Sequence, residues 1–217
     1  SYIDKGGPPG SAGVYISRGG EGDILVPLTS LGVKKVGSSF SVDYDKENTT
    51  LSHEIAHQVT DYEYYAPGSR GWFTEGMAEY IAQSGYRSGK FNVNDLSKLK
   101  EYVTAYGEGN TGGRALGEEI NAPNLEDFFT QSYGQFTENG NFNYGLAALV
   151  VYYYFHMDEN KDATNIKAFL QGLKARQLRR CLSPFSPVAP GTRWRTILPR
   201  VGAPGVSKLI SDNFVET

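Results

Sequence analysis

Two histidines flank a glutamate in the segment "HEIAH", which runs from His53 to His57. On a helix, residues four apart differ by about 40° in direction and about 6 Å in height, so both imidazoles can face one ion. Two neutral imidazoles make half of a tetrahedral zinc site. Glu54 would lie beside the metal, where its carboxylate can take a proton from a metal-bound water. A solvated helix face that spells this short pattern by chance is the alternative.

A third ligand would decide between these two interpretations. The chain has only three histidines, and the third, His156, lies far along the sequence. Glu63 would require an abrupt reversal of the chain, and Asp61 is best explained as a solvated or capping residue of the same helix. The segment "WFTEGMAEY" offers Glu75 and Glu79, which lie one helical turn apart, and seventeen residues separate His57 from Glu75.

The pairing of HExxH with "TEGMAEY" resembles the gluzincin zinc metallopeptidases, which include thermolysin-like enzymes and related aminopeptidases. The resemblance implies that Glu75 is the third ligand of one zinc ion, although the interval after His57 is a residue or two shorter than in the family. It also implies that Glu79 accepts a hydrogen bond from His53, as expected for a carboxylate that orients a zinc-bound imidazole. Glu79 as the ligand is the alternative that the Trp-Phe-x-Glu-Gly context disfavours.

The activity implied by the resemblance is hydrolysis of peptide bonds in peptides or proteins, by a zinc-bound water that Glu54 activates. Tyr144, at the start of an apolar run, is the candidate for binding the oxyanion, and a core tyrosine is the alternative. His156 is twelve residues further on, about 18 Å along a helix, so the two side chains cannot reach one zinc. We expect His156 to be a packed or capping residue.

Three features bear on the mode of action. The run "SFSVDY", residues 39–44, precedes the expected zinc helix, and the resemblance implies that such a strand pairs with an extended substrate; a purely structural strand is the alternative. No motif for binding a substrate amine precedes His53, which favours an endopeptidase over an aminopeptidase. A zinc-stabilised binding module without activity is the competing hypothesis, which the presence of Glu54 disfavours.

The surrounding pattern predicts an α+β fold: a small, twisted N-terminal sheet followed by a mostly helical core. Short apolar runs predict strands, and residues 47–62 repeat apolar side chains every four positions, with Asn48 or Thr49 as N-cap. The expected strands cover 13–17, 23–28 and 39–44, and the further helices cover 74–83, 92–106, 124–136, 143–157 and 165–178, with a loop over 107–123. We predict a catalytic domain over 1–175 and a C-terminal extension over 176–217. The extension is rich in proline and arginine and contains no tyrosine.

Composition excludes several classes of function. The net charge of −3 argues against a general nucleic-acid binder. The apolar run from Tyr144 to Met157 spans roughly 20 Å, which is shorter than a bilayer core, so we expect no membrane span. The single cysteine, Cys181, excludes an internal disulfide and a multi-cysteine metal cluster. We expect a monomer and, since the chain begins at Ser1 with no leader, a mature secreted or periplasmic protein.

Overall fold

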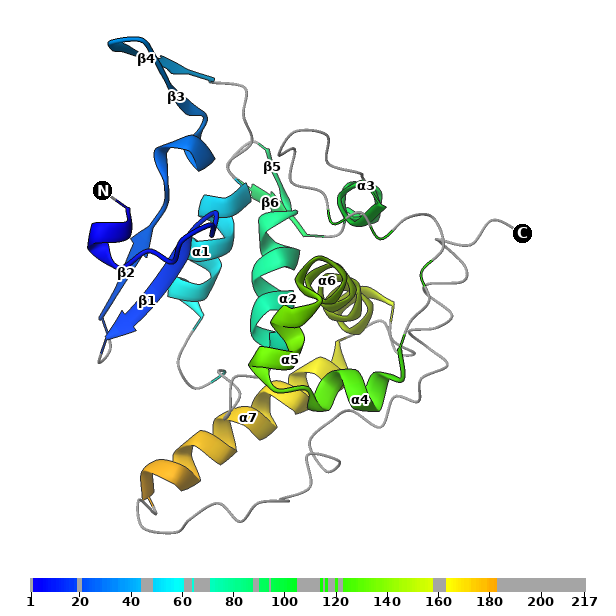
Figure 1. Cartoon of the computed structure of the whole chain (residues 1–217). Coiled ribbons are helices and arrows are strands. Elements are labelled where there is room, and N and C mark those ends of the chain that lie inside the picture. The colour runs from blue at the N-terminus through cyan, green and yellow to red at the C-terminus, as the bar shows by residue number, and fades with distance from the viewer. Residues whose placement is uncertain are drawn as a thin grey trace. The chain divides into compact units, whose positions relative to one another are not determined.

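The structure is a computed structural model, and the chain divides into two compact units, Ser1–Thr60 and Asp61–Thr217 (Figure 1). The predicted extension over 176–217 begins inside the helix α7 (Thr164–Leu182), and most of it lies outside the described residues. The structure describes residues 2–18, 21–43, 49–60, 64, 71–87, 90–93, 95–104, 114, 116, 120, 123–157 and 163–182.

The first unit contains two separate antiparallel hairpins and one helix. Strand β1 (Val14–Arg18) pairs with β2 (Glu21–Leu25), and β3 (Val33–Val36) pairs with β4 (Ser39–Val42). Short 3-10 helices, η1 (Ile3–Lys5) and η2 (Leu28–Leu31), precede the two hairpins. Helix α1 (Thr49–Val59) packs against the β1–β2 hairpin.

The prediction of a single N-terminal sheet is wrong. The strand predicted at 39–44 is β4, which pairs with the unpredicted strand β3 in a sheet separate from β1 and β2. The segment "VKKV" carries two lysines and looks like a loop, yet it forms β3. Gly37 supplies the reason, since its φ of +62° permits the tight turn that joins β3 to β4. The predicted strands at 13–17 and 23–28 are confirmed with shifted bounds, and the N-cap candidate Asn48 lies outside the described residues.

The predicted helix around "HEIAH" is confirmed as α1, but its apolar stripe is not its buried face. Ile55 and Val59 are exposed, at 41% and 68% of their surface. Glu54 and Ala56 are instead the buried residues of this helix. The four-residue repeat of apolar residues therefore predicted the helix correctly. It did not predict the buried face, which carries the Glu54 carboxylate.

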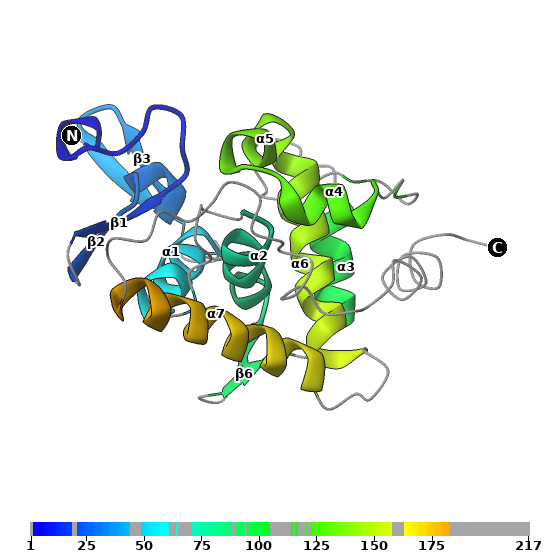
Figure 2. The same cartoon turned by 90° about the horizontal axis from the view of Figure 1, so that it is seen from below.

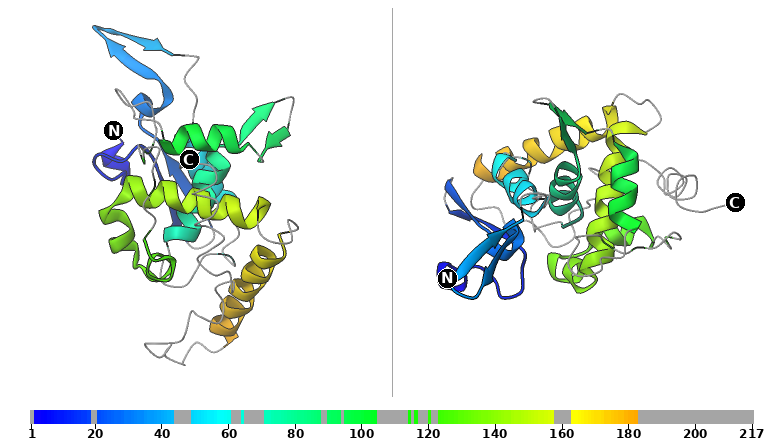
Figure 3. Two further views of the ribbon diagram at one scale, coloured as in Figure 1. Left: turned by 90° about the vertical axis from the view of Figure 1, so that its right-hand side faces the viewer. Right: turned by 90° about the horizontal axis from the view of Figure 1, so that it is seen from above.

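The second unit is built around one buried helix, α6 (Gly140–His156), which packs against α2 (Gly71–Ala82). The apolar run after Tyr144 is confirmed as a core helix, with every residue from Gly145 to Tyr154 buried. Helix α3 (Leu96–Thr104) lies beside α6 in Figures 2 and 3, and α7 (Thr164–Leu182) contacts α6 as well. Among the described residues, no helix has the length and apolar character needed to cross a membrane.

The remaining helices and strands of the second unit differ from the predicted ones. The helix expected over 124–136 is two helices, α4 (Leu125–Thr130) and α5 (Tyr133–Glu138). The side chains of Ser132 and Gln135 form a capping box that starts α5, which explains the break. A hairpin of β5 (Gly85–Arg87) and β6 (Lys90–Asn92), also missed, precedes α3. The α+β class is confirmed.

The close approach of α2 to α6 yields a stability prediction. A Cβ added at Gly76 would lie 2.8 Å from the carbonyl oxygen of Ala147, whereas at Gly134 of α5 it would meet nothing within 4 Å. We expect Gly76→Ala to lower the free energy of unfolding by about 1–3 kcal/mol, because a backbone atom cannot move aside. Gly134→Ala, the matched control, should leave it unchanged or up to about 1 kcal/mol higher. Urea unfolding measures both, and equal effects would contradict the close approach.

Candidate metal centre

The two histidines of α1 converge on a common point. Their Nε2 atoms are 3.1 Å apart, and the ring centroids are 4.7 Å apart with the ring planes nearly perpendicular. Two nitrogens bound to one tetrahedral zinc at 2.0–2.1 Å are about 3.3 Å from each other. His53 and His57 therefore have the separation that two imidazole ligands of a single ion require.

Glu54 is buried, with 7% of its surface exposed, and it lies against the chain just before β1. A Cβ added at Gly13 would be 3.1 Å from both Cγ and Oε1 of this side chain. The absence of a side chain at residue 13 thus leaves room for the carboxylate.

Helix α2 carries the acidic pair on its buried face. Glu75 and Glu79 are 7% and 3% exposed, and they lie one turn apart. The helix begins at Gly71, three residues earlier than predicted, so both glutamates lie in its interior. A buried carboxylate needs charged or hydrogen-bonding partners to offset its lost hydration.

His53, His57 and Glu75 each offer one ligand atom, and these atoms all lie within 4.8 Å of one another. This His-His-Glu group could hold a metal ion. Among the described residues it is the one such group of histidine, cysteine, aspartate and glutamate side chains. The ligand set contains nitrogen and oxygen donors and no sulfur.

Glu79 has a donor on each carboxylate oxygen, and neither donor was anticipated. The hydroxyl of Tyr102 on α3 donates to Oε2, and Nη2 of Arg114 donates to Oε1 as an ion pair. The predicted hydrogen bond from His53 to Glu79 stays a prediction. Tyr102 and Arg114 lie 23 and 35 residues from Glu79, and Arg114 comes from the stretch 107–123, whose lack of periodicity gave no signal for it.

Two tyrosines adjoin the Glu75 carboxylate. The hydroxyl of Tyr133, at the start of α5, donates to Oε1 of Glu75 over 3.3 Å. Tyr144, the predicted oxyanion residue, lies on α6 and is hydrogen-bonded to Tyr133. Burial, followed by the nearby charge of Glu75, raises the pKa of Tyr144, so this side chain is a neutral donor. Sequence reasoning missed Tyr133, which has no motif of its own.

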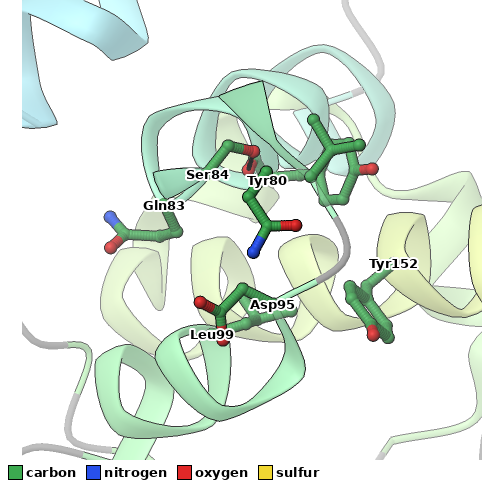
Figure 4. A pocket seen from close by; sticks show the side chains of 8 residues that line it. Tyr80, Gln83, Ser84, Asp95, Leu99 and Tyr152 are labelled. Atoms are coloured by element: carbon green, nitrogen blue, oxygen red, sulfur yellow. Dashed lines mark hydrogen bonds between the residues drawn. The ribbon is translucent and has the colours of Figure 1, made fainter. Parts of the chain in front are cut away.

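The third histidine is held in a separate cluster, as predicted. His156 ends α6, and its Nε2 is 2.7 Å from the hydroxyl of Tyr80. Its ring also packs against Tyr152, with centroids 4.6 Å apart. Tyr80 and Tyr152 line a small pocket together with Asp95, with Leu99 of α3, and with Gln83 and Ser84, which follow α2 (Figure 4). His156 is therefore a packed histidine.

The His156 cluster makes stability depend on pH. Burial lowers the pKa of His156 below its usual 6.5, so the unfolded chain binds a proton more readily than the folded one. We expect His156 to contribute stability that is present at pH 8 and lost as the pH falls below about 6.5. Urea unfolding at pH 8 and pH 5 should therefore show a smaller loss for His156→Gln than for wild type. An identical loss in both proteins would contradict the buried, neutral state of this ring.

Comparison with known proteins returned no match: no protein-family model, no curated protein and no solved structure matches the chain. The resemblance to the gluzincins thus remains a prediction that rests on the motif residues.

Proposed function

We propose that the protein is a zinc-dependent peptidase that cleaves peptides or proteins internally. The observation that carries the proposal is the His53–His57–Glu75 group, with Glu54 adjacent to its first histidine in the sequence. Two imidazoles, one carboxylate and an adjacent glutamate are the residues needed for metal-assisted hydrolysis. Reaction class, metal and substrate are all parts of this proposal.

The donor set suits zinc. Zinc binds histidine nitrogen and carboxylate oxygen in tetrahedral sites, and the Nε2 separation of 3.1 Å agrees with that geometry. Catalytic zinc sites use three protein ligands, whereas structural sites usually have four. The described part of the chain provides three in this group, which leaves a coordination position for water or substrate.

The residues around the group have separable roles in the proposed reaction. When bound, the zinc ion makes water more acidic and polarises the scissile carbonyl. Glu54 accepts the proton from the attacking water and delivers it to the leaving amine. Tyr144 donates a hydrogen bond to the developing oxyanion, and Tyr133, its hydrogen-bond partner, keeps that hydroxyl in place.

The substrate would bind as an extended strand. Strand β4 pairs with β3, and all four of its residues are exposed. Backbone groups on the second edge of such a strand can pair with a peptide. We propose that β4 positions the substrate backbone in this way, and that the protein acts as a secreted or periplasmic monomer.

A zinc-stabilised binding module without activity is the competing proposal, and an aminopeptidase is the second. The buried Glu54 favours hydrolysis, because a binding module has no use for a base beside its metal.

The Glu54→Gln variant tests the proposal directly. We expect it to bind about one zinc per chain, like wild type, and to lose cleavage of a peptide library, because an amide cannot accept the proton. Glu138→Gln, an exposed site on α5, is the matched control and should keep both properties. Metal analysis and mass spectrometry of the products give the two readouts. Zinc without cleavage in wild type would favour the binding module, and a wild type without zinc would refute both.

Replacement of Tyr144 or Tyr133 by phenylalanine tests which of the two hydroxyls donates to the oxyanion. We expect Tyr144→Phe to lower kcat by about 10²–10³-fold with little change in KM or zinc content, because only the transition state loses a hydrogen bond. Tyr133→Phe should lower kcat by about tenfold or less, since it removes a group that only supports the donor. The reverse order of the two effects would transfer the role to Tyr133. Equal, negligible effects would exclude both tyrosines.

A further inference from the structure

Arg114 contacts several side chains of the second unit, although it belongs to no motif of the sequence. Its Nη2 forms an ion pair with Oε1 of Glu79, and its Nε donates to the hydroxyl of Tyr102. The hydroxyl of Tyr102 in turn donates to the other oxygen of Glu79. Arg114, Tyr102 and Glu79 are thus linked in a closed ring of hydrogen bonds.

The position of Arg114 is set by backbone bonds and by stacking. Its backbone N–H donates to the carbonyl of Tyr102 over 3.0 Å, and the N–H of Leu116 donates to the carbonyl of Val103 over 2.8 Å. These bonds attach the segment to the end of α3. The guanidinium carbon lies 4.7 Å from the ring centroid of Tyr144, a cation–π contact. One side chain therefore contacts both Glu79 and the proposed oxyanion donor.

The charges of α2 explain why a cation is needed here. Glu75 and Glu79 are both buried and lie one turn apart, where like charges repel. The proposed zinc ion would balance Glu75. Without a cation of its own, Glu79 would be drawn toward the same ion and would compete with the ligand, which would weaken the site.

We infer that Arg114 is a positioning residue of the metal centre, which holds Glu79 away from the ligand position of Glu75 and supports the ring of Tyr144. This inference rests on the proposed function, because it assumes an ion at Glu75. Arginine suits the task because its planar fork donates to Glu79 and Tyr102 at once while its face stacks on an aromatic ring. A lysine ammonium at residue 114 could pair with Glu79 but could not make all three contacts.

Zinc affinity tests the inference independently of activity. Competition with a zinc chelator should show that Arg114→Met binds zinc about 10–100-fold more weakly than wild type, the usual effect of losing a group that orients a ligand. Arg114→Lys should recover only part of the loss. Lys100→Met, which removes a cation from an exposed position of α3, is the control and should keep wild-type affinity.

A double-mutant cycle with Glu79→Gln shows whether Arg114 acts through Glu79. We expect Arg114→Met to change zinc affinity by less than about twofold in the Glu79→Gln background, because the carboxylate that it controls is gone. The double variant also removes the unpaired buried charge, so it should fold, as judged by circular dichroism, even if Arg114→Met alone does not. An equal loss of affinity in both backgrounds would overturn the inference.

The two proposals fail in different ways. A wild type that binds no zinc refutes the proposed function. A wild type that binds zinc, together with Arg114→Met and Arg114→Lys variants of unchanged affinity, overturns the role of Arg114 alone. Loss of kcat in Arg114→Met with KM unchanged supports the contact with Tyr144, because a purely structural defect would not be confined to kcat.

Discussion

The burial of two carboxylates one turn apart on α2 is the constraint on which the second unit depends. Glu75 and Glu79 repel each other, and both have lost most of their hydration. Glu79 is compensated within the unit by Arg114 and Tyr102, from the segment after α3 and from α3 itself. Glu75 has a neutral donor in Tyr133, and in our proposal its charge is balanced by zinc. One helix face thus combines a compensated carboxylate with one that is suited to bind a cation.

The rest of the second unit keeps this helix in place. Gly76 lies between the two glutamates in the sequence, and its missing side chain lets α6 approach α2 closely. The long apolar helix α6 is buried along most of its length, and α2 packs against it. Tyr144 extends from that same helix toward Arg114 and Tyr133. The packing of the core and the arrangement of polar groups around Glu75 therefore depend on the same two helices.

Local patterns predicted the helices and the candidate ligands, whereas contacts between distant segments escaped prediction. The spacing in "HEIAH" indicated His53 and His57 as candidate ligands, because side chains four residues apart share one face of a helix. The resemblance carried by "TEGMAEY" implied Glu75 as the third. Strand β3 was missed because its pairing depends on the turn at Gly37 more than on its own residues. Arg114 and Tyr102 were missed because partners 35 and 23 residues from Glu79 leave no periodic signal. The exposure of Ile55 and Val59 likewise depends on tertiary packing, which the spacing of apolar residues does not predict.

X-ray absorption spectroscopy at the zinc edge tests the central claim most directly. For wild type loaded with one equivalent of zinc, we predict a shell of nitrogen and oxygen atoms at about 2.0–2.1 Å, with outer scattering from two imidazoles. The imidazole signal should correspond to His53 and His57, so His57→Ala should lose half of it. A sulfur atom at about 2.3 Å would implicate Cys181. That result, or an oxygen shell without imidazole, would contradict the proposed centre.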